Sequence, residues 1–199
     1  MNGLEKLTQL TELRLNLNKI KFVDELNGMF SLKTLFLFSN QIQTLSGIEN
    51  FTQLTDFRFY SNEIQSIEIL MERTLYLKYF YASYNQIESI TALKNMNQLT
   101  RIYASSNRIE SLMGIEKLIQ LVDLDLSLNK IKSIRELINL TKLTWLRLFS
   151  NQIESLKGLE NLTQLTDLRL SNNKISKYFL IYRDHNFLTY FTKIGYLIF

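Results

Sequence analysis

An eleven-residue phrase recurs along this chain and restricts its possible folds more than any other feature. It is clearest from Leu165 to Ile175, where leucines hold the first, fourth and sixth places and Asn173 holds the ninth. Equivalent asparagines precede it at intervals of twenty-two residues, with one interval of twenty-three: Asn18, Asn40, Asn62, Asn85, Asn107, Asn129 and Asn151. Self-similarity at such a period is typical of solenoids, in which each repeat packs against the next.

Each part of the phrase has a physical explanation. Leu168 and Leu170 are two residues apart, so in an extended segment both face one side and Arg169 faces the other. The asparagine stands where the strand must turn, and its amide supplies two donors and one acceptor. We therefore expect stacked asparagines to bind the backbone of neighbouring turns. Each backbone group that is left unpaired when an asparagine is replaced should lower the free energy of unfolding by roughly 1–3 kcal/mol.

The segment after each asparagine is also regular. After Asn151, apolar residues stand at offsets of two, five, eight, eleven and fourteen: Ile153, Leu156, Leu159, Leu162 and Leu165. With the phrase, this resembles the leucine-rich repeat over residues 4 to about 176. The match is to the class typified by the leucine-rich regulatory subunit of protein phosphatase 1, and bacterial internalins share a similar repeat. The resemblance implies an α/β fold: an arc-shaped leucine-rich-repeat solenoid with a parallel concave sheet and short 3₁₀ or helical convex turns.

We expect eight repeats over residues 1–176, with strands at the third to seventh places, for example Asp123 to Ser127. The array starts in mid-repeat, because Gly3 to Leu10 matches Gly158 to Leu165, and this favours a fragment or one product of a larger gene. The single extra residue falls within residues 69–76, where we expect a bulged convex loop before the core resumes in phase at Leu77. Phe38 to Thr55 recurs 111 positions later, which indicates internal duplication.

Residues 177–199 depart from the pattern. They are rich in aromatic and apolar residues, with Phe187, Phe191, Ile194 and Ile198 at helical spacing. Tyr182 and Arg183 faintly resemble the Tyr-Arg pair that precedes the terminal helix of related caps. We expect either an imperfect helical cap or a degenerate tail.

Three glycosylation acceptor patterns, at Asn50, Asn139 and Asn161, share one offset of the repeat, so we interpret them as repetition of a turn.

The outward strand positions predict an aromatic concave surface. Because neighbouring strands lie about 4.8 Å apart, equivalent residues should form columns over roughly 35 Å. Soluble monomers rarely expose large apolar patches without a partner, and Tyr, Trp and Arg are common binding hot spots. The alternative is that aromatics simply suit parallel strands. The candidate protein-binding residues are Phe36, Phe38, Asp56, Arg58, Tyr60, Tyr79, Tyr81, Tyr84, Arg101, Tyr103, Asp123, Asp125, Trp145, Arg147, Phe149, Asp167 and Arg169.

Little in the chain indicates chemistry. There is no cysteine, and the only histidine, His185, has no neighbouring partners for a catalytic or metal site. Asp123 and Asp125 share a strand face, but acidic residues are common in binding repeats. The net charge is +4 with mixed signs and no basic run, so nucleic-acid binding is not expected. No apolar run is long enough for a transmembrane helix. We expect neither an enzyme, nor a cofactor, nor a small-molecule substrate.

The expected function is therefore binding of a partner protein. The family resemblance implies the protein phosphatase 1 catalytic subunit, in cytoplasm or nucleus, with Asp56, Asp123, Asp125, Trp145 and Phe149 of the residue types that family uses. The arginines and the tyrosine-rich middle depart from that acidic pattern. The alternatives are an internalin-like cell-surface or secreted adhesion protein, a scaffold in an RNA–protein or cytoskeletal assembly, and a fragment that folds without a partner.

Overall fold

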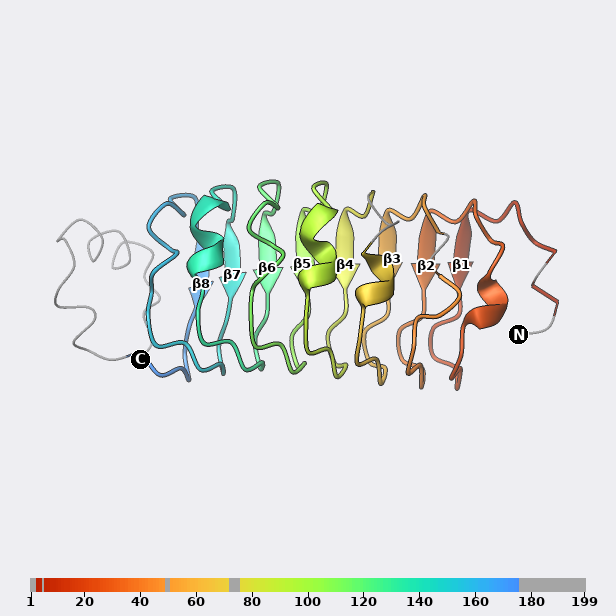
Figure 1. The fold of residues 1–199 in the computed structure, drawn as a ribbon, viewed down its shortest axis with the longest axis horizontal. Helices are drawn as coiled ribbons and strands as arrows, with labels where there is room; N and C mark the ends of the chain where they lie inside the picture. The colour runs from red at the N-terminus through yellow and green to blue at the C-terminus, as the bar shows by residue number, and fades with distance from the viewer. Residues whose placement is uncertain (1–2, 5, 49–50, 72–75, 176–199) are drawn as a thin grey trace.

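The computed structural model describes residues 3–4, 6–48, 51–71 and 76–175, and these residues form a single solenoid. Its sheet has eight parallel strands in chain order, with each strand beside the next (Figure 1). The strands are β1 (Glu12–Arg14), β2 (Thr34–Phe36), β3 (Asp56–Arg58), β4 (Tyr79–Tyr81), β5 (Arg101–Tyr103), β6 (Asp123–Asp125), β7 (Trp145–Arg147) and β8 (Asp167–Arg169). Equivalent places of neighbouring repeats are paired in register, so the α/β leucine-rich-repeat architecture is confirmed.

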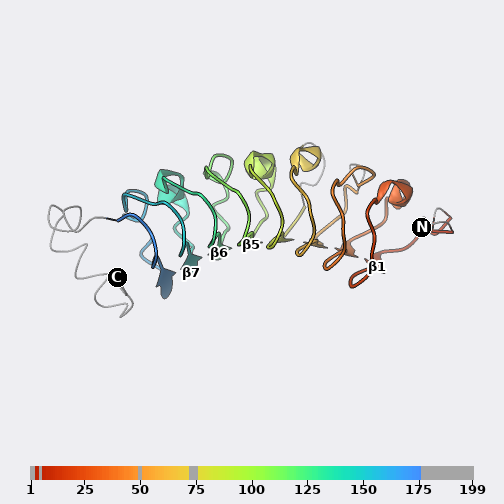
Figure 2. The same ribbon diagram turned by 90° about the horizontal axis from the view of Figure 1, so that it is seen from below.

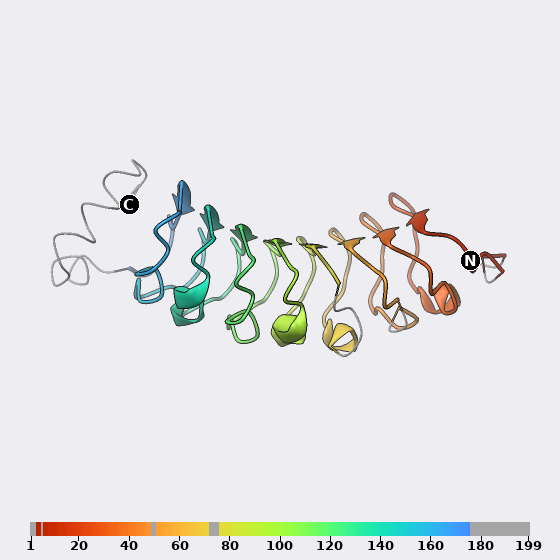
Figure 3. The same cartoon turned by 90° about the horizontal axis from the view of Figure 1, so that it is seen from above.

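The return segments lie opposite the sheet and contain short 3₁₀ helices. These are η1 (Asp24–Leu26), η2 (Glu68–Leu70), η3 (Thr91–Asn95) and η4 (Arg135–Asn139). Figures 2 and 3 show the strands along the inner side of a shallow arc and the 3₁₀ helices along its outer side. The segment Leu156 to Leu162 instead makes successive turns, in which Leu159 N–H donates to Leu156 C=O and Leu162 N–H to Leu159 C=O. The convex side is therefore made of short 3₁₀ helices and of successive turns.

The strands are shorter than expected, because each spans the third to fifth places instead of the third to seventh. The eighth residue of every described repeat has a positive φ of 54–60°, and this left-handed turn bends the chain away from the sheet. The eight residues are Leu17, Ser39, Ser61, Tyr84, Ser106, Leu128, Ser150 and Asn172. Single hydrogen bonds still link neighbouring repeats past the strand, for example from Leu128 N–H to Phe149 C=O at 2.9 Å.

The predicted asparagine ladder is present. The Asn129 amide donates to the carbonyl of Ala104 in the preceding repeat at 3.0 Å and to Leu126 in its own repeat at 3.0 Å. Its Oδ1 accepts the N–H of Ile109 at 2.9 Å. Asn85, Asn107 and Asn151 repeat this pattern and are buried to a similar extent. One side chain therefore holds the turns of two successive repeats together.

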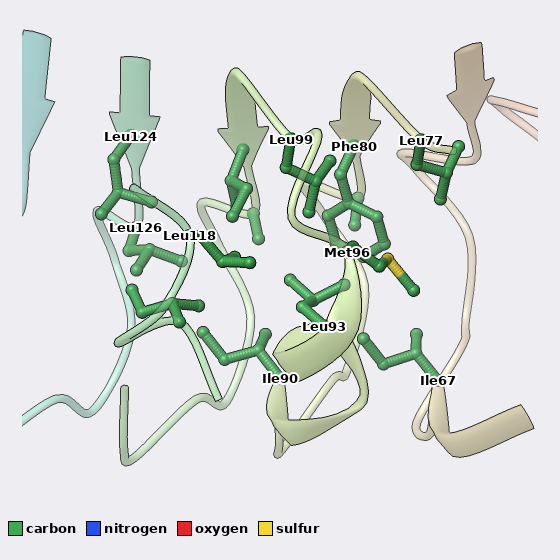
Figure 4. Packing of buried hydrophobic residues seen from close by; sticks show 14 of the residues in the cluster. Ile67, Leu77, Phe80, Ile90, Leu93, Met96, Leu99, Leu118, Leu124 and Leu126 are labelled. Atoms are coloured by element: carbon green, nitrogen blue, oxygen red, sulfur yellow. The ribbon is translucent and has the colours of Figure 1, made fainter. Parts of the chain in front are cut away.

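The core runs between the sheet and the return segments over the whole array. Leucine and isoleucine at the inward places are almost fully buried, and Leu77 is buried in phase as expected. In Figure 4, Phe80 points from the strand side toward Leu93 and Met96 of the return segment. Phe59 meets Phe80 edge-on, with ring centroids 5.3 Å apart. Phe80 holds the fourth place of its repeat, and the sixth place is held by the small residue Ala82. In the β4 repeat a large ring is thus accompanied by a small neighbour, whereas the β3 repeat buries two rings, Phe57 and Phe59, at the same places.

Two expectations lie wholly or partly outside the described residues. The proposed convex loop includes residues 72–75, and the proposed tail or cap with His185 lies within residues 176–199. Asn50 is likewise outside them, whereas Asn139 and Asn161 are exposed on the convex side.

Candidate interaction face

The concave face is built by the alternation of the strands. In β4, Phe80 points inward and is fully buried, while Tyr79 and Tyr81 point outward and are partly exposed. Every strand from β2 to β8 has the same buried middle residue between two accessible ones. All seventeen predicted residues are at least partly exposed, and the most exposed are Tyr84, Arg101, Trp145 and Arg169. Thirteen of them are the outer residues of strands, whereas Phe38, Tyr60, Tyr84 and Phe149 follow the strand ends, and the role of all seventeen in binding stays a prediction.

The fifth places form a continuous column of rings and guanidinium groups. The Cζ atom of Arg14 lies 5.0 Å from the Phe36 ring centroid, and that of Arg58 lies 4.5 Å from the same ring. The Arg58 Cζ atom also lies 4.8 Å from the centroid of the Tyr81 ring. Tyr81 and Tyr103 continue the column with ring centroids 5.2 Å apart. Side chains from β1 to β5 are thereby packed against one another before any partner arrives.

Carboxylates orient most of the arginines. Arg58 donates to both oxygens of Asp56 at 2.7–3.2 Å, and Arg169 donates to Asp167 at 3.0 and 3.1 Å. The hydrogen bond to Asp56 raises the pKa of Arg58, although burial opposes it. Arg101 reaches across to β6, where its Nε lies 2.9 Å from Asp123 Oδ2. The pairs at Arg58 and Arg101 hold planar cations beside the rings of Phe36, Tyr81 and Tyr79.

Tyr103 joins the aromatic column to the same network. Its hydroxyl donates to Asp123 Oδ2 at 3.3 Å. Burial raises the pKa of Tyr103, and the Asp123 carboxylate raises it further. A hydrogen bond to Tyr81 raises the pKa of Arg101. The middle of the face therefore combines tyrosine rings, one carboxylate and one guanidinium in direct contact.

The seventh places form a second, interrupted column. Phe38 and Tyr60 stack face to face, with centroids 4.5 Å apart and planes at 7°. Ser83 and Ser105 follow, with their hydroxyls 3.0 Å apart, and then Ser127. Phe149 resumes the aromatic character on the β7 repeat. Because short serines separate Tyr60 from Phe149, this column is not one aromatic strip.

The structure divides the predicted surface into two parts. The fifth-place ring contacts end at Tyr103, because Asp125 occupies the next place and accepts the backbone N–H of Ser127 at 3.0 Å. Beyond it, Trp145 and Arg147 form a separate cluster, with the Arg147 Cζ 4.3 Å from the Trp145 ring. Arg14 is a member of the face that our prediction omitted. Its Glu12-x-Arg14 spacing matches Asp56-x-Arg58, and this pattern could have revealed it.

The described residues contain no group of three or more His, Asp or Glu side chains that could hold a metal ion. Asp123 and Asp125 are engaged with Arg101, Tyr103 and the Ser127 backbone. In the described part of the chain, no helix has the length and apolar content needed to cross a bilayer. The chemical capacity of this face is therefore recognition by rings, hydroxyls and paired charges.

The register, the asparagine ladder and the accessible sheet define a leucine-rich-repeat solenoid. The family model "Leucine Rich repeats (2 copies)" matches residues 141–181. Among solved structures, the chain is similar to the internalin inlF of Listeria monocytogenes, with 32% identity and a TM-score of 0.85, over 88% of this chain and 52% of that one. No curated protein sequence matches the chain.

Two further bacterial structures share the fold. Internalin C2 of Listeria monocytogenes is 25% identical with a TM-score of 0.77, over 84% of this chain and 74% of that one. A leucine-rich-repeat protein of Leptospira interrogans is 25% identical with a TM-score of 0.80, over 94% of this chain and 54% of that one. The chain thus spans about half the length of inlF and of the Leptospira protein.

Proposed function

We propose that this protein is a non-enzymatic interaction module that binds a partner protein across its concave face. The observation that carries the proposal is the unbroken column from Arg14 through Phe36, Arg58 and Tyr81 to Tyr103. These residue types dominate binding hot spots, and here mutual packing restrains them before binding. Less side-chain entropy is then lost when a partner docks, so more of the contact energy appears as affinity.

The charge pattern favours protein over nucleic acid as the partner. Nucleic-acid affinity comes mainly from cations that neutralise phosphates. Arg58, Arg101 and Arg169 each contact a carboxylate of this chain, so their charge is already compensated. A compensated surface rich in tyrosine suits a protein surface of mixed polarity, with the charged pairs setting orientation more than affinity.

Photo-crosslinking tests this proposal. Tyr79 is replaced by p-benzoyl-phenylalanine, which keeps an aromatic side chain on β4, and the purified protein is irradiated in extract of its source cells. Discrete crosslinked proteins should appear, and Tyr103→Ala should weaken their binding by about 2 kcal/mol. The matched control carries the same residue at Ile138, which is 38% exposed on the convex side. Crosslinks from position 138 alone would place the interaction elsewhere and refute the proposal.

The similarity to two internalins favours a second candidate, an internalin-like adhesion protein at the cell surface or outside the cell. Antibody labelling of intact cells that express the native gene tests it. Labelling of intact cells supports the adhesion function, whereas labelling only after permeabilisation contradicts it.

Regulation of protein phosphatase 1 in cytoplasm or nucleus stays a prediction from the repeat resemblance. Trp145 is 41% exposed and available for such a contact, whereas Asp56 and Asp123 are paired with arginines. Phosphatase pull-down with the wild type and with Trp145→Ala decides it. Recovery with the wild type and loss with the variant supports this partner, and no recovery with either excludes it.

A further inference from the structure

Arg147 differs from the other arginines at the fifth place of a repeat in the residue that precedes it by two. Glu12, Asp56 and Asp167 stand two places before Arg14, Arg58 and Arg169, and each contacts its arginine. On β7 this place is held by Trp145. The acid that would neutralise Arg147 within its own strand is thus replaced by an exposed ring.

The carboxylates around Arg147 are engaged elsewhere. In the sheet register, Asp123 and Asp167 flank Trp145, and Asp125 lies beside Arg147. Asp123 binds Arg101 and Tyr103, and Asp125 accepts the backbone N–H of Ser127. Asp167 hydrogen-bonds Arg169 and also forms a longer ion pair with Arg147, with 3.7 Å between its Oδ2 and an Arg147 Nη. Each nearby acid therefore already serves another donor.

Arg147 is consequently under-coordinated within the described part of the chain. Its Nε is buried and has no hydrogen-bond partner there, while 26% of its side chain remains exposed. The guanidinium lies over the Trp145 ring, 4.3 Å from the centroid. A planar, partly exposed cation supported by a ring is suited to bind a carboxylate, and such charge-assisted bonds are about twice as strong as neutral ones.

We propose that Arg147 and Trp145 form a subsite for an Asp or Glu side chain of the partner, next to an apolar partner residue that covers the indole. The proposal rests on the proposed binding function of the concave face. The incoming carboxylate accepts hydrogen bonds from the Arg147 Nη groups, and the apolar residue packs on the exposed part of Trp145. The aromatic column from Arg14 to Tyr103 supplies the remaining contact, so this subsite selects acidic segments among possible partners.

Selection of phage-displayed random peptides on the purified protein tests the subsite. Display by fusion at the peptide's C-terminus leaves no free C-terminal carboxylate, so any acid selected comes from a side chain. Selected peptides should be enriched in Asp or Glu beside an apolar residue. Their affinity should fall about tenfold or more in Arg147→Gln, because a charge-assisted hydrogen bond is lost. Arg147→Lys should also weaken binding, since lysine lacks the planar fork, and Trp145→Ala should weaken it as well.

The control variant is Arg135→Gln, which removes the same charge from an exposed residue of η4 on the convex side. It should leave peptide affinity unchanged, whereas Asp125→Asn should raise it a few-fold by removing a neighbouring negative charge. Circular dichroism and thermal melting of each variant verify that the solenoid is intact.

The outcomes separate the subsite from the proposed function. Peptides that depend on Tyr103 but lack acids, or are insensitive to Arg147→Gln, overturn the subsite and leave the concave binding function standing. Equal loss in Arg147→Gln and Arg135→Gln shows a general charge effect and also overturns the subsite. Peptides insensitive to both Tyr103→Ala and Arg147→Gln, or no selected peptide at all, overturn both proposals.

Discussion

At the scale of single residues, two neighbouring places control each turn of the solenoid. The eighth residue adopts a left-handed backbone conformation, which is unusual for leucine and tyrosine, as at Leu128 and Tyr84. The asparagine that follows binds carbonyl and N–H groups of its own and the preceding repeat. The asparagine side chain thus compensates the backbone groups that the turn removes from the ladder.

Loss of one ladder asparagine should be costly. Asn129→Ala removes the acceptor for the buried Ile109 N–H and one of the two asparagine donors to the carbonyls of Ala104 and Leu126. Those carbonyls keep hydrogen bonds from Asn107 and Asn151, so the Ile109 N–H is the group left unpaired. We expect the free energy of unfolding to fall by roughly 1–3 kcal/mol for this unpaired N–H, measured by urea denaturation. Asn161→Ala, at an exposed convex position, is the control. Equal stability of the two variants would contradict the structural role of the ladder.

Tyr103 predicts a pH effect in the alkaline range. Burial raises its pKa in the folded protein, so the unfolded chain loses the proton first. Its contribution to stability is therefore unchanged below the unfolded-state pKa of about 10 and falls as pH rises from there through the folded-state pKa. Ultraviolet titration of tyrosinate should show that Tyr103→Phe removes a late-titrating group, and Asp123→Asn should lower the pKa of that group. Removal of an early-titrating group instead would contradict the prediction.

At the scale of elements, the return segments are of two kinds, those with a 3₁₀ helix and those with a glycine of positive φ at the place of that helix. Gly47, Gly114 and Gly158 have positive φ, and each lies in the repeat directly after one with a 3₁₀ helix: η1, η3 and η4. The duplication over 111 positions places η4 at the equivalent of η1 and Gly158 at the equivalent of Gly47. Each glycine permits close contact with the backbone at the start of the preceding helix.

Gly158→Ala should therefore destabilise the protein through a backbone clash. A Cβ at this position would lie 2.0 Å from the carbonyl oxygen of Ile134. Gly28→Ala is the matched control, because Gly28 has a similar φ of 111° but nothing within 4 Å of the added carbon. We expect Gly158→Ala to lower the free energy of unfolding by about 1–3 kcal/mol more than Gly28→Ala. Equal losses in thermal or urea denaturation would show that only φ matters.

At the scale of the whole molecule, the apolar core extends along the array of repeats, so stability depends on the interfaces between stacked repeats. The apolar cluster continues through the array, and each strand contacts its sequence neighbours. A solenoid of this kind has a stability near the sum of repeat and interface terms. The same stacking assembles the concave face, since residues twenty-two positions apart become neighbours.

Deletion of residues 108–129 tests this additivity. It removes β6, joins Asn107 to Lys130 in phase, and stacks the η4 repeat on the η3 repeat, much as η3 already contacts η2. We expect a folded, cooperative protein with a lower free energy of unfolding and a smaller urea m-value, because less surface is exposed on unfolding. Circular dichroism and urea denaturation measure both quantities. An unfolded deletion protein would show that stability is not additive by repeats.

The amino-acid sequence by itself determined the solenoid, the inward and outward alternation, the asparagine ladder and the membership of the concave columns. These features follow from local geometry, because strand residues alternate faces and a constant repeat length aligns equivalent residues. Only the tertiary structure decided the three-residue strand length, the positive φ at the eighth place, the end of the ring column at Tyr103 and the under-coordination of Arg147. The strand length and the positive φ depend on where backbone pairing between neighbouring repeats gives way to the turn. The end of the ring column and the under-coordination of Arg147 depend on which side chains the adjacent repeats place nearby, and no single repeat contains that information.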